Sequence, residues 1–98
     1  MFDIKSAGDG RVLLSGRFDA SQADVARKEF DKIAASSVVD FKDLEYISSA
    51  GLGVLFAAQK RLKGQGQGLR LVNMNQHIRD VFRYARFDLI FEIQDSPQ

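Results

Sequence analysis

The sequence predicts an α/β domain with a mixed, mostly parallel five-stranded sheet, and three observations lead to this fold class. Two short runs that suit strands stand on either side of a glycine-rich turn at the start of the chain. After them, segments of helical periodicity alternate three times with short apolar runs. This alternation is typical of parallel strands joined by right-handed helical crossovers, with one antiparallel edge from the opening hairpin. The 98 residues suffice for one domain, which we place over residues 1–98.

The first third of the chain predicts a hairpin and a helix. Phe2–Ser6 alternates apolar and polar residues, residues 7–10 supply turn formers, and Val12–Leu14 begins a second strand that ends at 16–19. Ser21 is the predicted N-cap of a helix over about 21–35, with Asp24 at the position of a capping box. The apolar face of this helix comprises Ala23, Ala26, Phe30, Ile33 and Ala34.

The remaining elements follow from the same patterns. We expect a short strand over 38–41, a helix over 52–63, a glycine-glutamine turn over 64–68 and a strand over 69–73. Asn75 is the predicted cap of a third helix, and a last strand is expected over 89–93, before a tail over 95–98. The apolar face of the third helix comprises Ile78, Val81, Phe82 and Ala85.

Composition excludes several classes of function. The chain has no cysteine, which excludes disulfides and thiolate metal sites and favours the cytoplasm. Its net charge of +1 lacks the basic excess of proteins that bind nucleic acid. The N-terminus does not resemble a signal peptide, and no apolar run approaches the length of a membrane span. We therefore expect no membrane insertion, no metal and no cofactor.

The segment Ser48-Ser49-Ala50-Gly51-Leu52-Gly53 lies where a loop becomes a helix. The N-terminal end of a helix favours negative charge, and two glycines there would cost about 1 kcal/mol each relative to alanine. The chain therefore needs a bare backbone at this point, either for close approach of a partner or for tight internal packing. Taken alone, the two serines are explained by helix capping.

Enzyme functions are disfavoured by the motifs present. Ser49 lacks the flanking glycines of a nucleophile elbow, and His77 is the one histidine that could act as its base. We expect His77 to be a surface residue of the third helix. The glycine-glutamine turn follows a helix and precedes a strand, which is the reverse of the order in a phosphate-binding loop.

Arg79, Arg83 and Arg86 fall at helical spacing and predict a basic stripe on the third helix. A solvated helix face explains such a stripe, and a docking surface for an acidic partner is the alternative.

Two elements of the chain closely resemble the STAS domains, and specifically the bacterial anti-sigma factor antagonists. One is Asp40-Phe41-Lys42-Asp43-Leu44 followed by residues 46–55, and the other is Gly16-Arg17-Phe18-Asp19, similar to the Gly-x-Leu-Asp element of the family. The resemblance implies a fold with three helices packed on one side of the sheet. It also implies a partner-switching role, in which the protein binds an anti-sigma factor that is a serine kinase and is reset by a PP2C-type phosphatase.

Carried over by position, the resemblance makes Ser49 the phosphorylated serine. The implied partner-binding residues are Asp19, Ser48, Ser49, Ala50, Gly51, Leu52 and Gly53. Two positions depart from the family pattern: Ser48 stands where aspartate is frequent, which makes it a second acceptor, and the chain is short at its C-terminus, without a final helix. We expect a monomer or weak homodimer. The alternative function is a constitutive accessory subunit of a lipid-transport ABC system, or of a larger signalling assembly.

Overall fold

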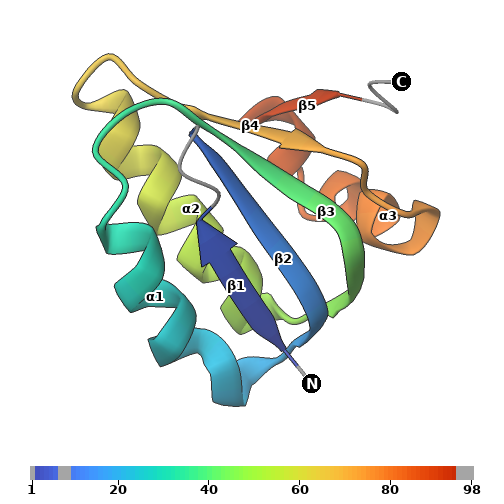
Figure 1. Cartoon of the computed structure of the whole chain (residues 1–98). Coiled ribbons are helices and arrows are strands. Elements are labelled where there is room, and N and C mark those ends of the chain that lie inside the picture. The colour runs from blue at the N-terminus through green and yellow to red at the C-terminus, as the bar shows by residue number, and fades with distance from the viewer. Residues whose placement is uncertain (1, 7–9, 95–98) are drawn as a thin grey trace.

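The computed structural model describes residues 2–6 and 10–94, which form a layer of strands and a layer of helices (Figure 1). The first elements are β1 (Asp3–Ser6), β2 (Arg11–Phe18), the short 3-10 helix η1 (Ala20–Gln22) and α1 (Ala23–Asp31). They are followed by β3 (Ser37–Ile47), α2 (Ser49–Lys63), β4 (Leu69–Val72) and α3 (Gln76–Tyr84). The chain continues with the 3-10 helix η2 (Phe87–Leu89) and β5 (Glu92–Gln94).

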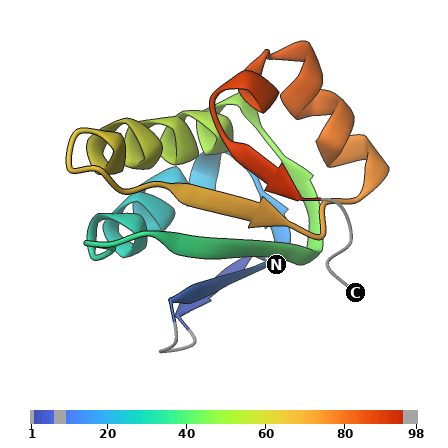
Figure 2. The same ribbon diagram turned by 90° about the horizontal axis from the view of Figure 1, so that it is seen from above.

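The five strands form one sheet in the order β1-β2-β3-β4-β5. β1 pairs with β2 antiparallel, and the other three pairings are parallel. Consecutive parallel strands joined by right-handed crossovers place their helices on one side of a sheet. In Figure 2 the three α-helices lie above β1, and no helix lies on the opposite side, below β1. The predicted mixed sheet with helices on one side is confirmed.

The core lies between the sheet and the helices. Four phenylalanines from different elements are almost completely buried in it: Phe18, Phe30, Phe41 and Phe82. The Phe82 ring meets Phe41 and Phe91 edge to face, with centroids 5.9 and 5.8 Å apart, an arrangement that aromatic pairs prefer. These contacts fix α3 against β3 and the start of β5.

The first helix is shorter than predicted, and Ser21 is not its N-cap. Asp19 Oδ1 accepts hydrogen bonds from the Ser21 amide (3.1 Å) and the Ser21 hydroxyl (2.6 Å), so the chain first makes the turn η1. α1 begins at Ala23 without a side-chain cap and ends at Asp31. It ends there because the amides of Lys32 and Ile33 bond three residues back, a tightening that commonly closes helices.

Strand β3 is eleven residues long, where a short strand over 38–41 was predicted. The exposed charges of Lys42 and Asp43 interrupt the simple alternation of apolar and polar residues. Two register shifts against β2 absorb this interruption, and Leu44 and Ile47 both reach the core. The alternation of apolar and polar residues did not reveal the full length of β3, because a bulge changes the face of the sheet on which the following side chains lie.

The C-terminal prediction is also corrected. Leu89 and Ile90 were placed in a strand, but Leu89 ends η2, Ile90 follows it, and both are exposed. Phe91 is buried and Phe87 packs against the core, so they occupy the apolar positions. Ala85, predicted on the buried face of α3, is its exposed C-cap. The predictions for residues 7–9 and 95–98 lie outside the described residues.

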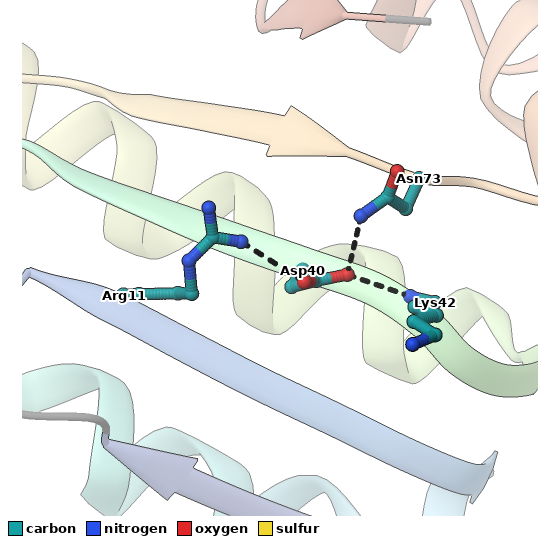
Figure 3. Close-up of polar contacts among 4 residues, drawn as sticks. All are labelled: Arg11, Asp40, Lys42 and Asn73. Carbon is teal, nitrogen blue, oxygen red and sulfur yellow. Dashed lines mark hydrogen bonds and ion pairs between the residues drawn. The ribbon is translucent and has the colours of Figure 1, made fainter. Parts of the chain in front are cut away.

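A charged cluster ties three strands together on the helix-free face (Figure 3). Asp40 in β3 receives Arg11 Nη1 of β2 at 3.0 Å and Asn73 Nδ2, just after β4, at 3.0 Å. The backbone amide of Lys42 donates to the same carboxylate at 2.9 Å. Every hydrogen bond drawn in this cluster ends on Asp40, whose side chain is 12% exposed, so its charge is neutralised within the sheet.

Candidate functional site

The candidate site is the start of α2, beside the carboxyl end of β2. The backbone amide of Ser48 donates to the Phe18 carbonyl at 2.9 Å, which joins the last residue of β2 to the residue before α2. Asp19 follows Phe18 directly. The two sequence elements that carry the family resemblance, far apart along the chain, therefore meet at this point.

Ser48 is the N-cap of α2. Its Oγ accepts a hydrogen bond from the Gly51 amide at 3.1 Å, and its carbonyl accepts from the Leu52 amide at 2.9 Å. The backbone of Ser48 is extended, and the residue is half-buried. α2 thus begins at Ser49 rather than at the predicted Leu52, because the cap lies three residues earlier than the apolar pattern indicated.

Ser49 is the first residue of α2 and is exposed. Within residues 2–6 and 10–94, its hydroxyl has no hydrogen-bond partner. It stands at the end of the helix where unpaired amides and the aligned peptide dipoles favour an anion. The arrangement presents a free hydroxyl to solvent at a position that tolerates added negative charge.

The two glycines of α2 serve different purposes. A Cβ on Gly51 would lie 2.9 Å from Ile47 Cγ1 and 3.1 Å from the Phe18 ring, so only glycine lets the helix approach the sheet this closely. A Cβ on Gly53 would have nothing within 4 Å. Tight internal packing therefore explains Gly51. It does not explain Gly53, which leaves a bare patch of helix on the surface.

The other predicted site residues divide between surface and interior. Asp19 and Ala50 are half-buried, and Asp19 caps η1. Leu52 and Gly51 are buried and can act on a partner only by positioning the surface residues. Ser49 and Gly53 are the two exposed members of the predicted set.

The exposed face of α2 extends further than sequence reasoning predicted. Phe56, Ala57 and Lys60 are also exposed and continue the line of Ser49 and Gly53 at helical spacing. The spacing of i, i+4, i+7, i+8 and i+11 was a signal in the sequence, but an aromatic residue such as Phe56 is normally expected on the buried face of a helix. Its ring instead stacks on Phe87 at 5.6 Å and stays partly open.

The basic stripe predicted on α3 is not continuous. Arg83 lies in α3 and pairs with Asp80 at 3.9 Å, and Arg79 is half-buried. Arg86 lies beyond the end of the helix with φ 64°, so it leaves the line of the other two. The left-handed turn at Arg86 separates it from the stripe.

A cavity of about 470 Å³ lies near the opposite end of the molecule, between the glycine-glutamine turn and the start of β4. Its buried polar side chain, Gln59, donates to the Ile90 carbonyl (3.0 Å) and accepts from the Leu69 amide (2.8 Å). The described residues leave no buried side-chain donor or acceptor without a partner. The cavity therefore has no unsatisfied buried group that would hold a ligand.

Within the described residues, the structure does not bring His77 together with the two serines. His77 is exposed on α3, and none of its described contacts is a hydrogen bond to Ser48 or Ser49. In the described part of the chain, no three histidines, cysteines or acids gather where they could hold a metal ion. None of the helices within residues 10–94 has the length and apolar character that crossing a bilayer requires.

Comparison with known proteins gives a consistent set of relatives. The Anti-sigma-B factor antagonist of Bacillus subtilis is 31% identical, with 98% of this chain and 92% of that protein covered. BtrV of Bordetella bronchiseptica, provisionally named an anti-sigma factor antagonist, is 34% identical over 89% of this chain and 74% of its own length.

Solved structures show the same fold. The unphosphorylated form of the anti-sigma factor antagonist SpoIIAA from Bacillus matches with a TM-score of 0.78 and 17% identity, covering all of this chain and 90% of that one. Its phosphorylated form matches with a TM-score of 0.73 and 16% identity, covering 100% and 93%. The family model described as "Mlab, STAS domain" matches residues 2–92. The chain therefore belongs to the STAS domain family, and two of the relatives that it matches are named as anti-sigma factor antagonists.

Proposed function

We propose that the protein is an anti-sigma factor antagonist whose switch is Ser49. With Ser49 unmodified it binds an anti-sigma factor that is also a serine kinase, and phosphorylation of Ser49 by that kinase releases it. A PP2C-type phosphatase removes the phosphate, and the cycle runs in the cytoplasm. The observation that carries the proposal is the exposed Ser49 hydroxyl at the start of α2, which has no hydrogen-bond partner in the described part of the chain.

The geometry favours Ser49 over Ser48 as the acceptor. Ser48 Oγ is held by the Gly51 amide at 3.1 Å and serves as the cap of α2. Phosphorylating Ser48 would disturb that cap, whereas Ser49 can react without the loss of a described hydrogen bond. Ser48 therefore supports the site, and Ser49 carries the modification.

Two electrostatic effects of the phosphate can be compared. It adds about −1.5 to −2 charges at neutral pH. At the exposed start of a helix these charges stabilise by about 1 kcal/mol, so the fold should hardly change. The same charge buried without a partner in a flat interface costs several kcal/mol, which is about two decades of affinity or more. The second effect is larger, so the phosphate acts between molecules.

The alternative is a constitutive accessory subunit that docks through the same surface without a kinase. The relatives named as anti-sigma factor antagonists favour the switching function over this alternative. Incubating the protein with the kinase and locating phosphate by mass spectrometry separates the two functions. A switch gives a phosphopeptide at Ser49, and a constitutive subunit gives none.

The test of release uses Ser49→Asp and a matched control. The anti-sigma factor kinase is first isolated with the wild-type chain as bait and then purified. We expect Ser49→Asp to weaken its binding by about 100-fold, because the carboxylate adds an unpaired charge to the interface. Gln76→Asp places the same charge at the first residue of α3 and should leave the affinity unchanged.

Calorimetry or surface plasmon resonance gives both dissociation constants, and thermal unfolding checks the fold. Ser49→Ala should bind as the wild type does and resist release by ATP. Undiminished affinity of Ser49→Asp would overturn the proposal.

A further inference from the structure

We infer that Arg17 and Tyr46 form a second anchor for the anti-sigma factor, one that receives a carboxylate from an acidic segment of that partner. The inference rests on the proposed function and extends it from the switch to the choice of partner. It is carried by the juxtaposition of an exposed guanidinium, which has no ion pair within the described residues, with an aromatic ring close to the start of α2.

The pair is held by a cation–π contact. Arg17 Cζ lies 4.4 Å from the centroid of the Tyr46 ring. Arg17 is exposed and Tyr46 is half-buried. Their neighbours Phe18 and Ile47 point into the core, so the pair lies on the helix-free face of the sheet.

The pair is adjacent to the switch along both strands. Phe18, which follows Arg17, accepts the hydrogen bond from the Ser48 amide, and Ser48 lies two residues after Tyr46. A partner that covers Ser49 therefore needs to reach only over the rim of the sheet to contact the pair.

A β-bulge creates this pairing. Gly16 is opposite Leu44 and Arg17 is opposite Tyr46, so Glu45 is the extra residue on β3. Gly16 has φ 83°, a conformation that favours glycine. In a regular register Arg17 would face Glu45 and form a cross-strand ion pair. The bulge replaces that carboxylate with an aromatic ring, and Arg17 has no acidic partner among residues 2–6 and 10–94.

Arg11, on the same strand, shows the contrast. Its guanidinium is paired with Asp40 at 3.0 Å in the cluster of Figure 3. Arg17 forms no ion pair with any residue of 2–6 or 10–94. Arg11 therefore stabilises the sheet through its ion pair. Arg17 is held in place by Tyr46, and its guanidinium is available to bind a partner.

The chemistry of the free guanidinium selects its ligand. Stacking on Tyr46 restrains the plane of the group while its N–H edges remain open to solvent. A planar fork of donors matches a carboxylate with two parallel hydrogen bonds. Arginine and tyrosine are also among the residue types that are enriched where binding energy concentrates at protein interfaces. An aspartate or glutamate of the partner is the ligand that fits.

The experiment measures binding of the purified anti-sigma factor kinase at low and at physiological salt. We expect Arg17→Glu to weaken binding about tenfold or more, mainly through slower association that responds less to salt. Arg17→Lys should recover part of the affinity, since it keeps the charge but not the fork. Tyr46→Leu should weaken binding several-fold, and Tyr46→Phe, which keeps the ring, should not.

The control is Arg83→Glu, an equal change of charge on exposed α3, which should leave binding unchanged. Thermal unfolding of each variant excludes loss of the fold, and Arg17→Gln repeats the test without a new negative charge. If Arg17→Glu bound the kinase as tightly as the wild type while Ser49→Asp still bound weakly, this inference alone would be overturned. Retained binding by Ser49→Asp would instead overturn the proposed switch.

Discussion

Helices α2 and α3 both begin at a polar cap that follows a parallel strand. Ser48 Oγ accepts from the Gly51 amide at 3.1 Å, and Asn75 Oδ1 accepts from the Ile78 amide at 2.8 Å. Beyond the caps the two helices differ. The first five residues of α3 are Gln76-His77-Ile78-Arg79-Asp80, and those of α2 are Ser49-Ala50-Gly51-Leu52-Gly53.

The difference separates what a helix start needs from what a binding surface needs. α3 is capped by Asn75 although its first turn carries large polar side chains, so capping alone does not require small residues. Packing accounts for the buried Gly51 but not for the exposed Gly53. Neither capping nor packing requires the bare surface at Gly53. The proposed docking of the anti-sigma factor would explain it.

The strongest test of this comparison fills the space that Gly51 leaves. Gly51→Val should destabilise the fold by about 3 kcal/mol, since its Cβ alone would lie 2.9 Å from Ile47 Cγ1 and the valine methyl groups add to the overlap. Better helix propensity than glycine returns less than about 1 kcal/mol, so overpacking dominates. Urea unfolding measures the loss, and Gly53→Val is the matched control. An equal effect at both glycines would contradict the packing argument.

A second test removes each cap in turn. Asn75→Ala should cost about 1–2 kcal/mol, because Asn75 caps α3 and its Nδ2 also donates to the Leu44 carbonyl at 3.2 Å. Ser48→Ala should cost about 1 kcal/mol, because Ser48 supplies the cap alone. Thermal unfolding of both variants shows which substitution lowers the stability more. The reverse order would indicate that Ser48 does more for stability than capping.

The same two caps illustrate how far the sequence predicts this fold. Asn75 was predicted correctly because an apolar helical pattern begins directly after it. Ser21 had an equally good pattern, yet Asp19, two residues earlier, captured its amide and hydroxyl. Both residues are good caps, and propensity alone does not choose between two local hydrogen bonds that exclude each other.

Long-range features of the site were beyond sequence reasoning. Arg17 was visible in the element that resembles the family, but its pairing with Tyr46 depends on a bulge between β2 and β3. Periodicity describes one strand at a time, and a register shift is a property of two. The element order and the place of Ser49 near the start of a helix needed only local pattern and the family resemblance, so these were predictable, although α2 begins three residues before the predicted Leu52.

The smallest effect tests the bare surface directly. Gly53→Ala should stabilise the protein by about 0.5–1 kcal/mol, because alanine is the better helix former and its Cβ meets nothing within 4 Å. If a partner packs against this patch, the added methyl overfills the interface, and binding of the anti-sigma factor kinase should weaken by about tenfold. Unfolding and binding measured on one sample give both values. Weaker binding by a more stable protein cannot result from unfolding, so it would assign Gly53 to the contact, whereas unchanged affinity would remove Gly53 from the docking surface.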